Sequence, residues 1–173
     1  MFQPGELIVY GNTGVCRVEE ITQPVRTGPD CGRQYYLLKP LYQDGIIYTP
    51  VDNDKVPMRP ILSHEEAEAL IDLIPSLQTE NFCDATLQAL SQHYRSVMRS
   101  YDRRALLVLI MSIYAKRQQA QAYKRRLGAV DERFMKQAER LLYSELSIAL
   151  GIPFEEVQPY IAQRVTGGEK AGA

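Results

Sequence analysis

The hydrophobic pattern of the chain changes its period near residue 63, and this change limits the possible folds more than any other feature. Upstream, Cys16 and Val18 alternate with charged neighbours, which is the two-residue period of a strand with one solvent-facing side. Downstream, Ala67, Leu70 and Ile71 recur at the spacing of one helix face. The sequence therefore predicts an α+β chain, in which a small N-terminal β-barrel is followed by an all-α helical bundle.

Four strands are predicted in the first sixty residues. Each is a short run of β-branched and aromatic residues, and turn-forming Gly, Asn, Asp and Pro separate the runs. The predicted strands are Leu7–Tyr10, Val15–Ile21, Tyr35–Leu38 and Ile46–Thr49. A barrel of so few strands must either close or leave one strand edge exposed.

Several predicted helices follow, with start and stop signals at their ends. Ser63 and Glu66 form a capping box, Asp84 and Asp102 are predicted N-caps, and Gly151 is placed to end a helix. The predicted helices are 63–74, 84–100, one from 102 that is apolar all round over 105–111, 130–150 and a short one after Pro153. We expect a barrel domain at 1–60, a helical domain at 61–165 with 105–111 in its central helix, and a flexible tail at 166–173.

Charge is distributed unevenly although the net charge is only −1. Residues 91–140 hold 12 Lys and Arg against 4 Asp and Glu, and the rest of the chain is acidic. Such a basic block indicates an anionic partner, commonly nucleic acid. A solvated helical surface without a partner is the alternative.

Sequence motifs of enzymes are missing from the chain. It contains no Walker A, dinucleotide-binding, nucleophile-elbow or zincin motif. Three separated cysteines without C-x-x-C, with His64 and His93 as the other soft ligands, predict neither a metal site nor a cofactor. No apolar run is long enough for a membrane span, and the N-terminus lacks the features of a signal peptide. We expect a non-enzymatic cytoplasmic protein with no small-molecule substrate.

Ordered motifs along the chain resemble those of the CarD/CdnL family of bacterial transcription regulators, whose barrel domain also occurs in transcription-repair coupling factor. No single motif is diagnostic, but together they cover about residues 1–155. They are Gly5-Glu6-x-Ile8-Val9-Tyr10, Gly14-Val15-x-x-Val18, Tyr35-Tyr36-x-Leu38, Pro50-Val51-Asp52-Asn53, Arg59, Ser63-x-Glu65-Glu66, Tyr94-Arg95 and Ala138-Glu139-x-Leu141-Leu142-x-Ser144-Glu145-Leu146.

The resemblance implies a Tudor-like barrel that binds the RNA polymerase β subunit. In this mode an exposed edge strand of the barrel pairs with a strand of the β subunit. By position, that edge is Ile46, Ile47, Tyr48 and Thr49, with Arg26 as a nearby basic contact. Tyr48 stands where some members of the family have arginine. Pairing through backbone groups tolerates such changes, because side chains only adjust its specificity.

The resemblance also implies that the helical domain contacts promoter DNA at the upstream edge of the transcription bubble. Leu90 takes the position of a tryptophan that many members use as a wedge, and its alternative interpretation is an ordinary buried helix residue. Cations around it would hold phosphates without reading bases. The predicted DNA-binding residues are Leu90, His93, Tyr94, Arg95, Arg99, Arg103, Arg104, Lys124, Arg125 and Arg126.

These expectations combine into a nucleoid-associated regulator that binds polymerase and modulates the stability of the open complex. Two alternatives remain at this point. One is a polymerase-binding adaptor whose helical domain binds another protein. The other is an RNA-binding module, because small barrels beside basic helices also suit RNA.

Overall fold

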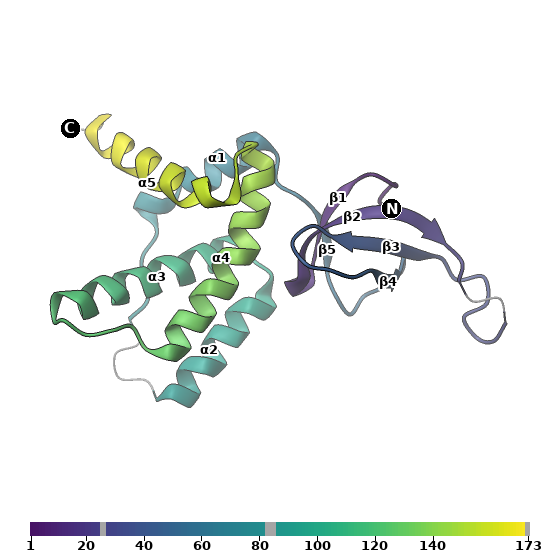
Figure 1. Ribbon diagram of the computed structural model, residues 1–173, viewed down its shortest axis with the longest axis horizontal. Helices are drawn as coiled ribbons and strands as arrows, with labels where there is room; N and C mark the ends of the chain where they lie inside the picture. The colour runs from purple at the N-terminus through teal and green to yellow at the C-terminus, as the bar shows by residue number, and fades with distance from the viewer. Residues whose placement is uncertain (25–26, 82–85, 172–173) are drawn as a thin grey trace. The chain divides into compact units, whose positions relative to one another are not determined.

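The chain is described by a computed structural model, which covers residues 1–24, 27–81 and 86–171. Internal contacts divide it into two compact units, Met1–Ile61 and Leu62–Ala173 (Figure 1). The first unit consists of strands and the second of helices, which confirms the predicted α+β arrangement. Each unit is described separately below.

The N-terminal unit is a five-stranded antiparallel sheet in the order β4-β3-β2-β1-β5. All four predicted strands are present. The fifth, β5, was not predicted, because its three residues end in a proline and are too few to show a period. The strands are β1 (Leu7–Tyr10), β2 (Gly14–Thr22), β3 (Tyr35–Pro40), β4 (Ile47–Pro50) and β5 (Met58–Pro60).

The sheet curls around a small core. Its buried residues are Ile8, Cys16, Val18, Tyr36 and Leu38. A register shift between Val18 and Glu20 bends β2, as a β-bulge does. The curvature lets the Tyr10 hydroxyl of β1 reach Thr49 Oγ1 of β4 at 3.4 Å, although two strands separate β1 from β4 in the sheet order. β4 and β5 remain as the two edges of this sheet.

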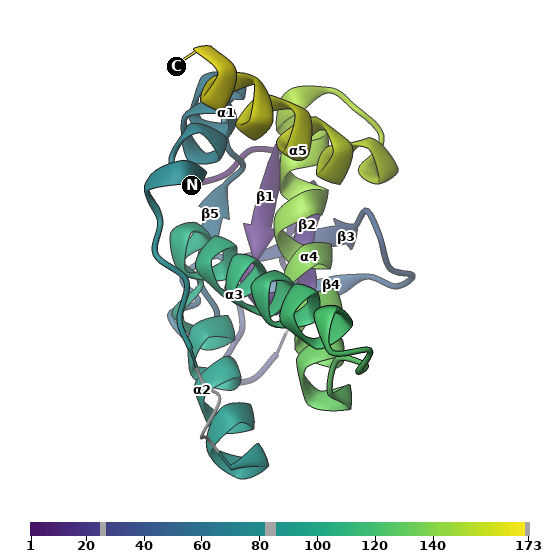
Figure 2. The same cartoon turned by 90° about the vertical axis from the view of Figure 1, so that its left-hand side faces the viewer.

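The C-terminal unit contains five α-helices, shown from two directions in Figures 1 and 2. Apolar residues from all five helices form one core. The helices are α1 (His64–Asp72), α2 (Leu87–Ser100), α3 (Arg103–Ala122), α4 (Ala129–Leu150) and α5 (Phe154–Ala171). None of them, within the described residues, combines the length and hydropathy that a membrane crossing requires.

The central helix of this unit is α4, not the helix that contains 105–111. α4 packs against α1, α2, α3 and α5, whereas α3 packs mainly on α2 and α4. The prediction failed because an all-round apolar run shows that a segment is buried without showing how many neighbours bury it. Val108 and Met111 are in fact partly exposed.

Local capping signals were mostly read correctly. Ser63 and Glu66 form the capping box, Asp102 caps α3, and Gly151 ends α4 in the left-handed conformation at φ 67°. The N-cap of α2 is Thr86, whose Oγ1 accepts a hydrogen bond from Ala89 N–H at 3.2 Å. The predicted cap Asp84 lies outside the described residues.

The last helix is longer than predicted. α5 continues to Ala171, so residues 166–171, expected as part of a flexible tail, have helical backbone. Just before this segment, Arg164 attaches the helix to α1, because it donates to Asp72 at 2.7 Å and to Glu68 at 2.6 Å. Contacts between residues so far apart in the chain leave no signal in the local sequence of a Gly/Ala-rich terminus.

Candidate functional site

Strand β4 is an edge of the sheet and carries exposed apolar side chains. Ile46 and Tyr48 are 60 % and 57 % exposed, and Leu41 and Tyr42, in the turn that leads to β4, are also exposed. Side chains along β4 alternate, so Ile47 packs on the core of the sheet while Tyr48 lies on the outer face. An edge of this kind can accept a strand from another protein.

The hydrogen-bond pattern determines which backbone groups of β4 face outward. Val51 N–H donates to Gln34 O at 3.0 Å, in register with the β3–β4 ladder. Antiparallel ladders alternate between hydrogen-bonded and non-hydrogen-bonded pairs. By this alternation the peptide groups of Ile47 and Thr49 face β3, and those of Tyr48 face the outer edge. Tyr48 therefore presents both its N–H and its C=O to a partner strand.

The opposite edge, β5, is less suited to strand pairing. It has three residues, follows Pro57 and ends at Pro60, and proline cannot donate a ladder hydrogen bond. Gly11 N–H donates to Pro57 O at 3.0 Å, so by the same alternation Met58 is the residue of β5 whose N–H faces outward. β4 is consequently the better edge of the two.

Not every predicted polymerase-binding side chain is available at this edge. Thr49 is 1 % exposed, and its Oγ1 accepts a hydrogen bond from Asn53 Nδ2 at 3.0 Å, so its side chain stabilises the sheet. Arg26 lies outside the described residues. Sequence reasoning missed Leu41 and Tyr42, because a turn next to a strand carries no periodic signal that separates exposed from buried apolar residues.

Two of the predicted DNA-binding residues belong to the helical core. Leu90 is 3 % exposed and Tyr94 is 2 % exposed, and both pack within the main hydrophobic cluster. Contact with DNA would require either side chain to leave this core. Leu90 is therefore the buried helix residue of the alternative interpretation.

Tyr94 also belongs to a buried polar network that joins three helices. Its hydroxyl donates to Asp131 Oδ1 at 2.6 Å, and Lys116 Nζ pairs with Asp131 Oδ2 at 2.8 Å. Burial, followed by the hydrogen bond to Asp131, raises the pKa of Tyr94 above its ordinary value. Tyr94 on α2, Lys116 on α3 and Asp131 on α4 thus fix the helices to one another.

Arg103 is likewise a structural residue. Its Nη2 and Nε atoms donate to Glu145 Oε1 at 2.6 and 3.0 Å, and the same oxygen accepts the Leu62 N–H at 3.0 Å. Glu145 is buried, and burial raises its pKa although the Arg103 guanidinium opposes that shift. Arg103 thus neutralises a buried carboxylate, and a phosphate contact would have to compete with this ion pair.

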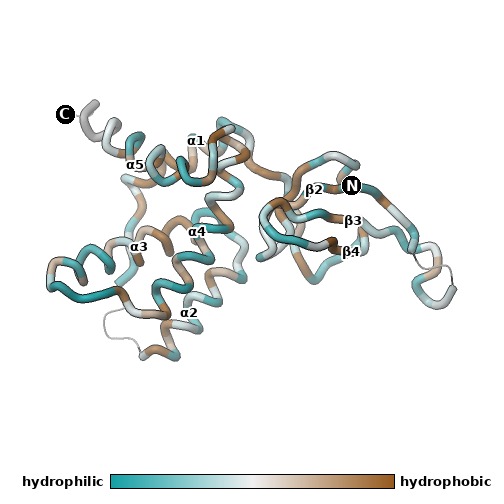
Figure 3. The backbone as a smooth tube through the Cα atoms, viewed as in Figure 1, coloured by the Kyte–Doolittle hydropathy of each residue, from teal (hydrophilic) through white to brown (hydrophobic). Residues whose placement is uncertain are grey.

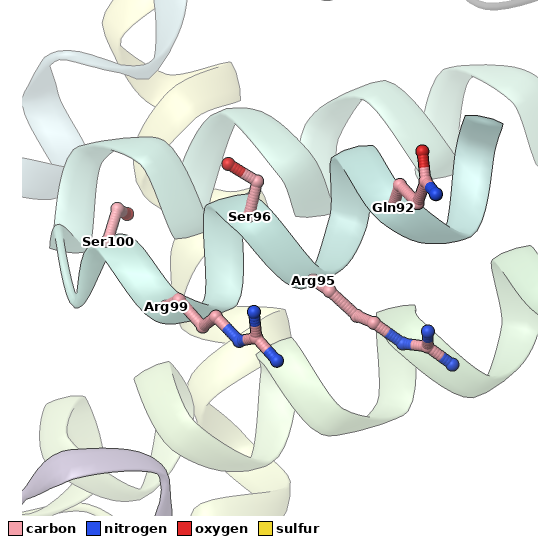
Figure 4. Close-up of a pocket in the computed structure, with 5 residues that line it drawn as sticks. All are labelled: Gln92, Arg95, Ser96, Arg99 and Ser100. Carbon is pink, nitrogen blue, oxygen red and sulfur yellow. The ribbon is translucent and has the colours of Figure 1, made fainter.

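Arg95 and Arg99 form the most accessible cationic site on α2. Figure 4 shows both side chains extending from the same side of the helix, one turn apart. They line a shallow surface pocket together with Gln92, Ser96 and Ser100, and all five residues are exposed. Guanidinium, amide and hydroxyl donors in one pocket suit the oxygens of a phosphate.

The remaining predicted cations differ in their availability. His93 is partly exposed, and its Nε2 lies 2.9 Å from Glu80 Oε2. Arg104 is exposed at the start of α3, and Lys124, Arg125 and Arg126 are exposed between α3 and α4. Of the predicted DNA-binding residues, those with exposed side chains are Arg95, Arg99, Arg104, Lys124, Arg125 and Arg126.

Comparison with known families assigns the N-terminal unit. Residues 2–62 match the family model of the CarD-like/TRCF RID domain, which is consistent with the resemblance to the CarD-like family over the N-terminal unit. The RID domain is an RNA polymerase β-subunit interaction domain, which makes this a transcription-related class of protein. The match ends where the helical unit begins. A comparison with curated proteins finds no match.

Proposed function

We propose that this chain is a non-enzymatic transcription regulator that binds the RNA polymerase β subunit through β4 and touches promoter DNA through its helical unit. One observation carries the proposal. The RID domain has an open edge strand whose outward peptide groups lie beside exposed Ile46 and Tyr48. Strand addition at such an edge draws its affinity from backbone hydrogen bonds and its specificity from alternate side chains.

The DNA contact is assigned to the exposed cations of the helical unit. Arg95 and Arg99 would hold phosphates near the upstream edge of the bubble, with Arg104 and the cations between α3 and α4 adding to the positive field. Such contacts are weak and do not depend on base sequence. Attachment to polymerase raises the local concentration of the helical unit at the promoter, so weak contacts suffice to modulate the stability of the open complex.

The polymerase contact is tested by Tyr48→Pro and Tyr48→Ala in the full chain, with binding to purified β subunit measured by biolayer interferometry. Proline removes the outward N–H of Tyr48 without removing a bond to β3, and we expect it to abolish binding. Alanine keeps the N–H and loses only the ring, so we expect a weaker loss of about tenfold.

Met58→Pro is the matched control, because it removes the outward N–H of the opposite edge. It should bind the β subunit as the unmodified chain does. Full binding by a folded Tyr48→Pro variant, or loss of binding in Met58→Pro alone, would contradict the assignment of β4. Circular dichroism of each variant establishes that the sheet is retained.

A further inference from the structure

The segment that joins α3 to α4 presents an aromatic ring together with three cations. Tyr123 is 79 % exposed, the largest exposure among the bulky apolar side chains of the described residues. Lys124, Arg125 and Arg126 follow it directly and are all exposed. These four residues are called the YKRR loop below.

The YKRR loop is held in a defined conformation by the end of α3. Arg125 N–H donates to Ala120 O at 2.7 Å, and Lys124 N–H donates to Gln121 O at 3.0 Å. These two bonds are those of a Schellman motif, in which glycine is the usual residue at the left-handed position. Here that position is Lys124, at φ 53°. A lysine therefore occupies a backbone position that favours glycine.

The sequence on either side of the YKRR loop is poor in negative charge. No Asp or Glu occurs between Asp102 and Asp131, a stretch that contains seven Lys and Arg. Asp131 is buried and paired with Lys116, and Glu132 is paired with Lys136 at 3.4 Å. Figure 3 shows the second half of α3 and the following loop as a hydrophilic stretch. The cations of the loop therefore have no acidic side chain among their described neighbours in sequence to neutralise them.

We propose that the YKRR loop binds single-stranded nucleic acid, with an unpaired base stacked on the Tyr123 ring and the adjacent phosphates held by the cations. An exposed aromatic ring beside a row of cations is the combination that single strands require, because each base has a face for stacking and each nucleotide carries one phosphate. In duplex DNA the bases are stacked on one another, so the ring has no face to contact. The inference rests on the proposed DNA contact and specifies its substrate as an unpaired strand.

The test measures binding of the full chain to fluorescein-labelled dT12, to rU12 and to a matched dA12·dT12 duplex by anisotropy, without polymerase. We expect Tyr123→Ala to weaken dT12 binding about tenfold and to leave duplex binding unchanged, whereas Tyr123→Phe retains binding. Tyr114→Ala removes a different exposed tyrosine, which lies within α3, and should have no effect. The ratio of dT12 to rU12 affinity distinguishes DNA from RNA as the source of the strand.

Lys124→Gly supplies a second, independent measurement. Glycine relieves the left-handed backbone strain, so the melting temperature should rise, while dT12 binding weakens and its salt dependence falls by about 0.7 in log–log slope. Unchanged dT12 binding in both Tyr123→Ala and Lys124→Gly, or equal losses on dT12 and duplex, would overturn the inference. The proposed polymerase contact is measured separately through β4, so either proposal can fail alone.

Discussion

For individual residues of α2, the sequence supported two competing predictions, burial in the helical core and contact with DNA. On α2, the positions of Leu90, Tyr94 and Met98 form one helical stripe, which predicts burial, while the family resemblance predicts that Leu90 and Tyr94 contact DNA. The structure buries all three, which agrees with the stripe, and a DNA contact would require Leu90 or Tyr94 to leave the core. Their neighbours Arg95 and Arg99 are exposed, and their DNA contact is part of the proposed function.

Leu90 permits a direct test of this distinction. We expect Leu90→Ala to lower the free energy of unfolding by about 2–5 kcal/mol, because it removes buried methyl groups and leaves a cavity. Leu87→Ala is the matched control on the same helix, since Leu87 is 70 % exposed and its truncation should change stability by less than about 0.5 kcal/mol. Urea denaturation monitored by circular dichroism measures both, and equal stability of the two variants would contradict the burial of Leu90.

At the scale of elements, ion pairs join the helices to one another. Sequence patterns alone would predict that the charged side chains of these pairs face solvent. Lys116 reaches Asp131 and Arg103 reaches Glu145, in both cases from α3 to α4. Arg164 joins α5 to α1 in the same way. These cations could not be separated by sequence from ones that face solvent, because their partners are 15, 42 and more than 90 residues away in the chain.

Arg103 and Arg104 are adjacent in sequence and should differ sharply in their effects. Arg103→Ala leaves the Glu145 carboxylate buried without its cation, and we expect a loss of about 3–5 kcal/mol in the free energy of unfolding at pH 7. Arg104→Ala, at an exposed position, should change it by less than about 0.5 kcal/mol. Lowering the pH should partly restore Arg103→Ala, because the raised pKa of Glu145 lets the buried group take up a proton. Denaturant titrations at pH 7 and pH 5 measure both effects.

The attachment of α5 to α1 should weaken as the pH falls, because its carboxylates have lowered pKa values, whereas the pKa of Glu145 is raised. Hydrogen bonds from Tyr160 and Arg164 lower the pKa of Glu68, and those from Arg164 lower the pKa of Asp72. A carboxylate with a lowered folded-state pKa stabilises the fold above its ordinary pKa of about 4 and loses that contribution as the pH falls through the lowered value. We expect Arg164→Ala to lower the melting temperature at pH 7 and to match the unmodified chain near pH 2. Gln163→Ala, an exposed neighbour, should show no difference at either pH, and a difference between Arg164→Ala and the unmodified chain that is constant with pH would contradict the mechanism.

For the whole molecule, local signals predicted the two-part architecture, four strands and most helix caps. Capping residues and periodic runs act within a few residues, so Ser63, Asp102 and Gly151 could be read correctly. Long-range packing decided the rest. The sequence did not reveal β5, the central place of α4 or the length of α5, and it could not show that Tyr48 and not Ile47 directs its peptide groups outward, because that depends on the register with β3.

The proposed roles of the two units, polymerase binding and DNA contact, predict that each can be lost without the other. Arg95→Ala together with Arg99→Ala should leave β-subunit binding unchanged and shorten the lifetime of promoter open complexes roughly tenfold, at about 0.5–1 kcal/mol for each phosphate contact. Gln92→Ala together with Ser100→Ala alters the same surface pocket without removing charge and should have a smaller effect. Open-complex lifetimes after heparin challenge measure the difference. An unchanged lifetime in the double arginine variant would remove these residues from the DNA contact.

The open edge of β4 has a further consequence for how the protein is shared among its partners. An edge strand has one outer side, so only one incoming strand can occupy it at a time. If polymerase binds at β4 as proposed, any other chain that pairs with this edge, including a second copy of this protein, competes with polymerase for the same place. Under that proposal, the fraction of polymerase that carries this protein depends on the concentrations of all such strands. An excess of a short peptide that copies the docking strand would displace the protein from polymerase while leaving both folded.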